Sequence, residues 1–519
     1  MNDPITVRPG DPRYDALTTG INQRYRSSPH EILLPRTTDE VVTAVRRAWA
    51  AGRPAVRSGG HCFEDFVDRD DADVLIDLSQ MDAVSWDDRH GAFSVQAGAR
   101  LLNVYEQLHR GWGVTVPGGI CYSVGVGGHV TGGGYGLLSR RDGLTVDHLH
   151  GVEVVVVDAA GRARPVVVTR ESTGEEADLF WAHTGGGGGT FGVVTRFLFR
   201  TPGPGPVLVR PPSQVLVSAL AVPWSRLDER GFGRLLGGFS RWHERHQAPD
   251  TPATALSSIL MLNHRSNGSV GLLTQVDGDA PDPDGILDEY LTTVLGDVRA
   301  ETMAEPAGEF GPLPWFAEPR RLPWLQATRL LGTNTPILND PTMRAEHKSA
   351  YVRRALPDEQ LATAYRHLTR PDVTNPNAML VALSYGGQIG SVDPSATAVA
   401  QRDSAFKLLY QSFWSDPAGD APNVAWVREF YRAMYARTGG VPVPDELTDG
   451  CYVNYPDADL SDPEQNTSGV PWHDLYFKDN HPRLQQVKER WDPLGVFGHR
   501  QSVSARPRVG ARAGGGDDG

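Results

Sequence analysis

The chain has 519 residues, of which 39% are hydrophobic and 22% charged, a composition typical of soluble globular proteins with more than one domain. Its formal net charge of -13 argues against a nucleic acid as partner, since phosphate backbones attract basic surfaces. No window approaches the roughly eighteen apolar residues of a membrane span, and the polar start MNDPITVRPGDPRYD lacks the pattern of a signal peptide, so we expect a cytoplasmic protein without membrane contact. The sequence gives no indication of an oligomeric state.

The first part of the chain alternates short strands with helices. Residues 31–34 predict a strand, and Thr37 and Glu40 have the spacing of a capping box at the start of a helix. After Pro54 the chain is expected to be extended, and it then enters a glycine-containing turn, Arg57-Ser-Gly-Gly-His61. The amides of this turn can face a diphosphate group. A Rossmann motif is not predicted, because no GxGxxG opens a helix here.

A second glycine-rich stretch, residues 117–136, reads PGGICYSVGVGGHVTGGGYG. Nine of its twenty residues are Gly, so we predict neither helix nor strand interior, where each Gly costs about 0.5–1 kcal/mol. It contains no Lys, Glu or Asp, which separates it from a flexible linker. Such a stretch lets backbone N–H groups approach a large, partly anionic ligand. One turn ends in His61 and the other carries Cys121, which suggests one extended cofactor with two covalent attachment points.

The other cysteines give no further site. Three cysteines are too few for a disulfide framework, and no metal-binding spacing such as CxxC occurs, so we predict no metal site. Cys62 and Cys451 are expected to be small buried hydrophobic residues.

Further along, residues 152–157 and 164–168 predict a β-hairpin, and a third glycine-rich stretch, residues 183–192, leads into a strand at 193–199. The segment TPGPGP at 201–206 marks the clearest boundary. Beyond it, extended and helical segments alternate, which predicts an α+β domain with an antiparallel sheet. We expect strands at 215–222, 259–263, 270–276, 379–384 and 406–413, helices at 230–246, 284–295, 358–369 and 423–438, and proline- and glycine-rich loops at 278–284 and 305–323.

Three motifs together, RSGGHCFEDF at 57–66, the stretch at 117–136, and CYVNY at 451–455, resemble the FAD-linked oxidases of the berberine-bridge-enzyme type in the vanillyl-alcohol-oxidase (PCMH) superfamily. The segments GGHCFEDFV, TGGVPVP and NTSGVPWHDLY resemble segments of the hexose oxidases that tailor lipoglycopeptide antibiotics. The resemblance implies an α+β protein with a two-lobed PCMH-type FAD-binding domain (1–205), a substrate domain (206–449), a C-terminal segment that returns to the FAD domain (450–505) and a disordered tail (506–519).

The resemblance also implies FAD bound covalently through both His61 and Cys121. Asn454 belongs to the C-terminal motif, and the glycine-rich stretches supply most of the other expected FAD contacts. The complete expected set is Arg57, Ser58, Gly59, Gly60, His61, Gly118, Gly119, Cys121, Val124, Gly125, Gly127, Gly128, His129, Gly132, Gly133, Gly134, Tyr135, Gly136, Asp147, Gly188, Gly192, Val193 and Asn454.

A flavin oxidase needs a base for the substrate's hydroxyl proton, and a phenol serves once its pKa of about 10 is lowered. By resemblance, Tyr455 is predicted to be the base, supported by Tyr452 and Tyr135. In an extended segment Tyr452 and Tyr455 would face opposite sides; the alternative is that both only pack. Tyr385, His473 and Tyr476 are the expected substrate contacts, and His129 either contacts the flavin or is a buried structural histidine.

Three functions remain open at this point. The first is an oxidase that transfers hydride from an alcohol of a glycosylated natural product to FAD and passes the electrons to O₂, giving H₂O₂; for a hexose the C6 alcohol would become an acid in two steps. The second is oxidative cyclisation or dehydrogenation of a polyketide or alkaloid-like metabolite by the same flavin. The third is a flavoprotein that uses FAD structurally, against which the paired tyrosines argue.

Overall fold

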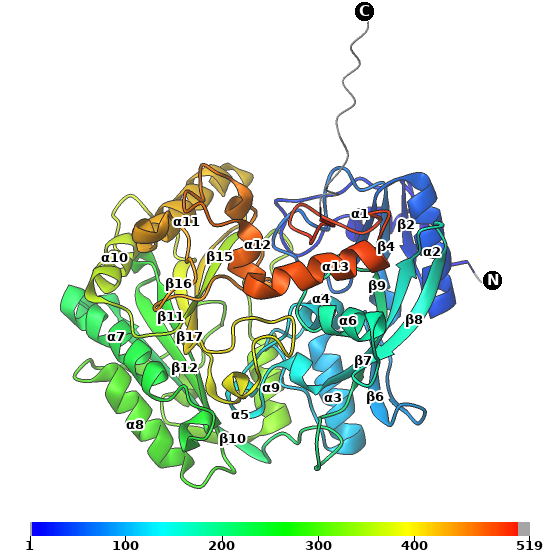
Figure 1. Ribbon diagram of the computed structural model, residues 1–519. Helices are drawn as coiled ribbons and strands as arrows, with labels where there is room; N and C mark the ends of the chain where they lie inside the picture. The colour runs from blue at the N-terminus through cyan, green and yellow to red at the C-terminus, as the bar shows by residue number, and fades with distance from the viewer. Residues whose placement is uncertain (1–2, 507–519) are drawn as a thin grey trace, which may run out of the picture.

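The computed structural model describes residues 3–506, and its chain forms two bodies that lie side by side (Figure 1). One body contains most of the first two hundred residues together with the last helix, and the other contains most of the middle of the chain. The tail predicted from residue 506 onward lies, apart from Arg506, outside the described residues. Among the described helices, none has the length and apolar character that crossing a bilayer requires.

The first body has two sheets. The four-stranded sheet has the order β1 (Ile5–Val7), β2 (Glu31–Leu34), β4 (Val74–Asp77), β3 (Pro54–Arg57), with β4 parallel to both of its neighbours. The five-stranded sheet is antiparallel, in the order β5 (Val84–Asp87), β6 (Ala92–Gln96), β9 (Val193–Phe199), β7 (Leu149–Val157), β8 (Ala163–Thr169). Helix α2 (Thr38–Ala51) contacts strands of both sheets and so joins them into one core.

The start of α2 shows half of the predicted capping box. The Thr37 side chain accepts a hydrogen bond from the Glu40 amide, as expected for an N-cap. The Glu40 carboxylate instead accepts from the backbone and guanidinium of Arg36. The arginine therefore takes the place that the N-cap amide has in a complete capping box.

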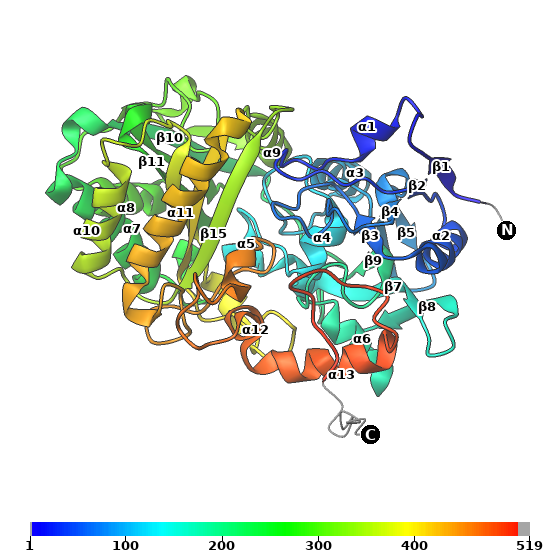
Figure 2. The ribbon, with the colours of Figure 1, turned by 90° about the horizontal axis from the view of Figure 1, so that it is seen from above.

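The second body is built on an antiparallel sheet. Its order is β13 (Glu301–Thr302), β10 (Gln214–Pro223), β12 (Ser269–Asp277), β11 (Leu256–Asn263), β16 (Ala378–Ser384), β17 (Phe406–Trp414), β15 (Arg344–Val352), and β14 (Arg320–Pro323) also pairs with β10. Helices α7 (Glu229–Arg245), α8 (Pro283–Leu295), α10 (Asp358–Leu368) and α11 (Asp420–Met434) cover one face, and the other face turns toward the first body (Figures 1 and 2). The α+β fold is thus confirmed. The change of sheet falls between β9 and β10, while the proposed domain limits stay a prediction.

The remaining helices mostly surround the junction of the two bodies. They are α1 (Tyr14–Leu17), α3 (Leu101–Trp112), α4 (Val126–Thr131), α5 (Ser139–Asp142), α6 (Glu175–Ala182), α9 (Trp324–Thr333), α12 (Trp472–Phe477) and α13 (His481–Trp491). Helix α13 packs against α6, which brings the end of the chain back to the first body.

The sequence analysis missed two main elements and misjudged a third. Strand β15 was not predicted because it carries Glu346, His347 and Lys348; all three are buried, and the Lys348 ammonium is neutralised by Asp457 and Asp459 at 2.6 and 2.7 Å. Helix α9 was also missed. The prediction that the stretch at 117–136 contains no helix is wrong, because α4 lies within it. The helix contains Gly127, which packs closely against Ser58 and Ala97, and Gly128, which faces open space, so tertiary structure outweighs their low helix propensity.

Candidate active site

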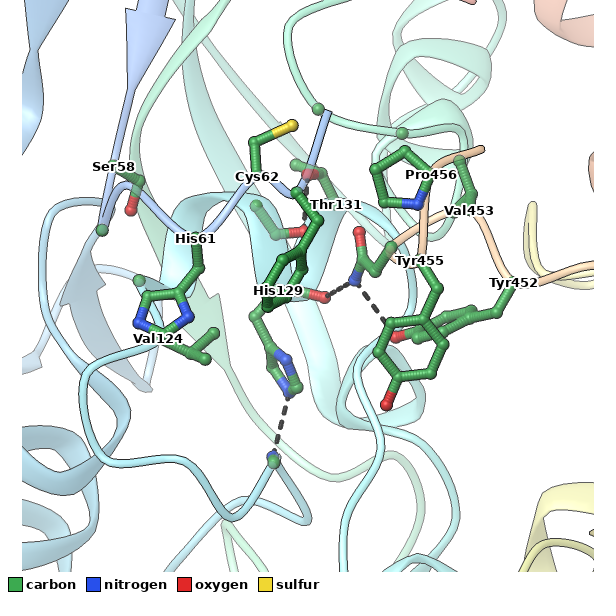
Figure 3. A pocket seen from close by; sticks show the side chains of 18 of the residues that line it. Ser58, His61, Cys62, Val124, His129, Thr131, Tyr452, Val453, Tyr455 and Pro456 are labelled. Carbon is green, nitrogen blue, oxygen red and sulfur yellow. Dashed lines mark hydrogen bonds between the residues drawn. The ribbon is translucent and has the colours of Figure 1, made fainter. Parts of the chain in front are cut away.

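A cavity of about 400 Å³ lies between the two bodies. The first body contributes backbone from its three glycine-rich stretches, the second body contributes side chains of β11, β16 and β17, and the segment 452–456 lies between them (Figure 3). Of the predicted contacts, those that line the cavity are Arg57, Ser58, Gly59, Gly60, His61, Gly119, Cys121, Val124, Gly125, Gly127, Gly128, His129, Tyr135, Gly136, Gly188, Gly192, Asn454 and Tyr476. All three stretches therefore meet at one site.

The first two glycine-rich stretches pack backbone to backbone. A Cβ atom on Gly59 would lie 2.3 Å from the Gly125 nitrogen, and one on Gly125 would lie 2.2 Å from the Gly59 nitrogen. Ser58 fastens the contact, since its hydroxyl donates to the Ala97 carbonyl at 2.6 Å and accepts from the Gly127 amide at 3.2 Å. Only glycine allows this approach.

Gly128 has a different reason to be glycine. A Cβ there would meet no protein atom within 4 Å, and the residue lines the cavity. Bare backbone at the N-terminal turn of α4 thus faces space that a ligand can fill. The absence of a side chain at this position leaves room for the diphosphate of a dinucleotide to approach the backbone.

Six of the predicted FAD contacts do not line the cavity: Asp147, described in the next paragraph, and five packed residues. Gly132, Gly133 and Gly134 pack instead against the C-terminal segment and neighbouring loops: a Cβ on Gly132 would lie 2.0 Å from Asn454 Oδ1, and the Gly134 amide donates to the Tyr452 hydroxyl at 3.3 Å. Gly118 packs under Tyr105 and His129, and Val193 is buried in β9, where the adjacent Val194 reaches the cavity. Close packing, rather than a ligand, accounts for these positions.

Two charged residues expected at the cofactor have structural partners. The Arg57 guanidinium is buried between Asp77, at 2.8 Å, and Asp68, at 3.5 Å. Asp147 does not line the cavity, and its carboxylate pairs with Arg402 at 2.9 Å. Because Arg57 is the only Lys or Arg among the described lining residues, a bound diphosphate would rely on backbone amides.

His61 and Cys121 lie on either side of one hydroxyl group. The Ser123 Oγ is 2.8 Å from His61 Nε2 and 3.6 Å from Cys121 Sγ. Burial, with a smaller contribution from Arg100, lowers the pKa of His61 to about 4, so its imidazole is neutral. Burial raises the pKa of the Cys121 thiol. The sequence analysis missed Ser123, whose only signal was its place two residues after Cys121.

The other cysteines differ from each other. Cys451 is buried, as predicted, and its thiol lies 3.3 Å from the Tyr431 hydroxyl. Cys62 is only half-buried and lines the cavity (Figure 3), which corrects the expectation of a buried residue. Burial of its thiol group raises its pKa to about 12, so it stays protonated.

Tyr135 and Tyr455 share a hydrogen bond of 2.5 Å between their hydroxyl groups. The expectation that Tyr452 and Tyr455 face opposite sides is wrong: the Tyr455 amide donates to the Tyr452 carbonyl, and this turn brings the ring centroids to 5.0 Å (Figure 3). The Tyr452 hydroxyl accepts from Gly134 and from Asn454 Nδ2, which also donates to the His129 carbonyl. Tyr452 is therefore held in the wall, while the hydroxyls of Tyr455 and Tyr135 form a hydrogen-bonded pair.

A lysine that the sequence analysis missed lies behind these rings. Lys407 Nζ is 3.1 Å from the centroid of Tyr135, 3.9 Å from that of Tyr452, and 4.5 and 4.8 Å from those of Tyr385 and Tyr351. It is buried without a hydrogen-bond partner among the described residues, and burial lowers its pKa. Burial likewise raises the pKa of Tyr455 and of Tyr135. The signal was a lysine within the apolar strand FKLLY.

Two of the three expected substrate residues, Tyr385 and His473, do not line the cavity. Tyr385 is fully buried beside Lys407, and its hydroxyl donates to the Gln401 carbonyl instead of reaching the cavity. His473 stacks on His481 at 3.8 Å, away from the cavity lining. Tyr476 does line the cavity, but its hydroxyl accepts from the Asp457 amide.

Two histidines bear on the remaining predictions. Burial lowers the pKa of His129 to about 4, and its Nε2 accepts a hydrogen bond from the Gly119 amide at 3.2 Å, so it supports the glycine-rich stretch at the cavity edge (Figure 3).

His473, Asp474 and His481 carry ligand atoms within 4.8 Å of one another. The two stacked imidazoles do not direct their lone pairs to a common point, so we assign no metal to them.

Comparison with known proteins decides the family. The FAD binding domain model matches residues 29–164, and the berberine and berberine-like model matches residues 451–504. The aclacinomycin-N/aclacinomycin-A oxidase of Streptomyces galilaeus is 46% identical over 95% of this chain and 88% of its own. The protein belongs to the berberine-bridge-enzyme-like FAD-linked oxidases.

Two hexose oxidases are also similar to this chain. The hexose oxidase of Chondrus crispus is 32% identical over 96% of this chain and 94% of its own. The crystal structure of a glycopeptide hexose oxidase complexed with teicoplanin matches with a TM-score of 0.88 and 42% identity, covering 98% of this chain and 99% of that chain. The oxidase is thus an FAD-dependent oxidoreductase with two-body PCMH architecture.

Proposed function

We propose that this FAD-linked oxidase oxidises an alcohol of a glycosylated natural product, with FAD attached to both His61 and Cys121 and with O₂ as electron acceptor. The observation that carries the proposal is the hydrogen-bonded pair Tyr135–Tyr455, which opens on the same cavity as His61 and Cys121. A protein that only stores FAD does not need two ionisable hydroxyls there. We also keep a cytoplasmic location as a prediction.

The double attachment is supported by the position of Ser123 between His61 and Cys121. Each bond to FAD would join His61 nitrogen or Cys121 sulfur to a ring-system carbon with loss of one hydrogen from each partner, and for each bond one O₂ would take up the two electrons and two protons to give H₂O₂. A neutral imidazole is the form of His61 that can act as nucleophile. The Ser123 hydroxyl can exchange hydrogen bonds with both reacting groups.

The proton of the substrate hydroxyl is assigned to the tyrosine pair. Burial disfavours the charged form of both groups: it lowers the pKa of the Lys407 ammonium and raises the pKa of the Tyr455 phenol. When both are charged, each reduces the cost of the other, and the ring faces of Tyr135 and Tyr452 hold the ammonium. Tyr455 can then accept the substrate proton while Tyr135 stabilises the phenolate through the shared hydrogen bond.

FAD, when bound, accepts hydride from the alcohol carbon and returns two electrons to O₂, which leaves as H₂O₂. The protein residues orient the substrate hydroxyl toward Tyr455 and keep the carbon beside the ring. Two of the relatives have a hexose oxidase name, and one was solved with the glycopeptide teicoplanin. A sugar alcohol is therefore the first substrate class to test.

The test is anaerobic mixing of the purified oxidase with a glycosylated antibiotic and, separately, with its aglycone, while the flavin absorbance is followed. Bleaching by the glycosylated compound alone is the expected result. Bleaching by the aglycone alone would contradict sugar oxidation and favour oxidation at carbon in the aglycone. Absence of reduction by any glycoside offered, in an enzyme that retains its flavin, would contradict the proposal as a whole.

A further inference from the structure

The second-body side of the cavity contains one carboxylate with no cation beside it. Glu309 is the only Asp or Glu among the described residues that line the cavity, and the one Arg there, Arg57, is already paired. Glu309 Oε1 accepts a hydrogen bond from Gln411 Nε2 at 2.7 Å. No ion pair to Glu309 occurs among the described residues, and its second oxygen has no protein donor but is not sealed from the cavity.

The local fold holds this carboxylate in a fixed place. Ala307 and Phe310 exchange two backbone hydrogen bonds of 3.1 Å, so Gly308 and Glu309 form the tip of a tight turn. Gly308 has a φ of +60°, and its amide donates to Asn263 Oδ1 at 2.9 Å. A Gly at the first turn position with positive φ is the requirement of a type II′ turn. The fold thus fixes the backbone that carries Glu309.

Other polar groups around Glu309 also lack protein partners. Gln411 on β17 is the register partner of His347 on β15, so both side chains belong to one part of the sheet face. His347, which is 3% exposed, and Thr335, which is 1% exposed, both line the cavity. Within residues 3–506, neither ring nitrogen of His347 nor the Thr335 hydroxyl has a hydrogen-bond partner. These three atoms are sealed from the cavity, in contrast to the second oxygen of Glu309, so the Glu309 oxygen rather than these atoms is open to a ligand.

We propose that Glu309, oriented by Gln411, is the recognition site for a protonated amino group of the substrate. The inference rests on the proposed function and narrows its substrate class to amino sugars and other basic glycosides. Burial raises the pKa of Glu309, because an ionised carboxylate in a largely apolar cavity is costly unless a charge of opposite sign pairs with it. The protein offers no such cation here, whereas a substrate ammonium would supply both the charge and the hydrogen-bond donors that Glu309 accepts.

The charge of Glu309 also affects the pKa of the proposed base, Tyr455. Glu309 contributes to the raised pKa of Tyr135, Tyr455 and Cys121, the titratable groups that face it from the first body and the C-terminal segment. From the second body it is faced by Gln411 and by His347, whose pKa burial lowers to about 3 and which is therefore neutral. A bound ammonium would cancel the negative charge and make ionisation of Tyr455 easier. Binding of the correct substrate thereby favours the active form of the base.

The experiment compares two probes of equal size, a methyl glucosaminide with a free amine and the methyl glucoside with a hydroxyl in its place. Equilibrium titration of each into the oxidised holoenzyme at pH 7 should show about 10- to 100-fold tighter binding of the amine, as expected for a hydrogen-bonded charge pair. In Glu309→Gln that preference should disappear, while Thr335→Val, which removes a neighbouring hydroxyl without changing charge, should keep it. In addition, the limb of the kcat/KM profile that reports Tyr455 should move to lower pH in Glu309→Gln.

Equal binding of the two probes by the wild-type enzyme, or a preference for the amine that survives in Glu309→Gln, would overturn the subsite. Weaker binding of both probes by the same factor in Glu309→Gln would also overturn it, because it would show a merely structural role. These results concern binding, whereas the proposed oxidation fails only if no glycoside reduces the flavin. The two proposals can therefore fail separately.

Discussion

The two walls of the cavity are built in opposite ways. The first-body wall is mostly bare backbone, in which Gly59 and Gly125 touch and Gly128 faces open space. The second-body wall consists of side chains from a rigid sheet, with Glu309 above it and Lys407 behind the tyrosines. The first wall leaves room for a ligand to approach bare backbone, whereas the second places ionisable groups in an apolar setting, where our proposals assign them to substrate recognition and proton transfer.

The sharpest test of the backbone wall compares its two kinds of glycine. Gly125→Ala should prevent close packing of the two stretches, since the new Cβ would lie 2.2 Å from the Gly59 nitrogen. We expect loss of both FAD binding and folding, measured as flavin per chain and as Tm. Gly128→Ala should leave the Tm of the flavin-free protein unchanged and still reduce FAD binding, because its Cβ meets only ligand space. Normal FAD content in Gly128→Ala would contradict the assignment of this surface to the cofactor.

The next largest effects are expected from removing the hydroxyls of Tyr455 and Tyr452. Tyr455→Phe should slow anaerobic flavin reduction by about 10²-fold or more, because it removes the proposed base. Tyr452→Phe should instead lower the free energy of unfolding by about 1–3 kcal/mol, since two donors, Gly134 N–H and Asn454 Nδ2, lose their acceptor. Stopped-flow absorbance and chemical denaturation separate the two effects. An equal loss of rate in both variants would show that the turn, rather than the Tyr455 hydroxyl, is what matters.

Lys407→Met tests whether charge on the second wall serves catalysis. Methionine has a similar length and is apolar, and it replaces a buried amine that has no hydrogen-bond partner. We expect a gain in stability of about 1–3 kcal/mol together with a reduction rate about 10- to 100-fold lower. Parallel loss of stability and rate would mean that Lys407 has only a packing role.

The first-body wall could be predicted from the sequence because its close backbone contacts require one residue type, glycine. Glycines that must approach another backbone cannot be anything else, so the turn at 57–61 and the stretch at 117–136 identified the site without knowledge of the fold. Which glycines line the cavity was less clear: Gly132 and Gly134 pack against the tyrosine segment, and only three-dimensional contacts separate them from Gly128.

The second wall could not be predicted because its residues gain their role from register and burial. Tyr385 and Lys407 lie on or beside neighbouring strands, yet the tyrosine is sealed in the core and the lysine holds the tyrosine rings together. Glu309 lay in a segment expected to be a loop, and nothing near it in the sequence indicates that its turn opens on the cavity. Strand β15 was hidden by charges that are neutralised only in the folded state.

The smallest expected effect concerns Glu64, a buried acid that does not line the cavity. Glu64, three residues after His61, accepts from the Tyr25 hydroxyl and the Ala458 amide, and burial followed by repulsion from Glu346 raises its pKa to about 8. The folded protein therefore keeps a proton that the unfolded chain releases near pH 4.5, so this contribution to stability is complete below pH 4.5 and is lost as the pH rises through 8. Between pH 5 and about 9, the Tm of the wild type should fall more than that of Glu64→Gln, which keeps the side-chain size and cannot ionise. Identical pH dependence in the two proteins would show that Glu64 is ionised in the fold, with Tyr25 and Ala458 stabilising the carboxylate.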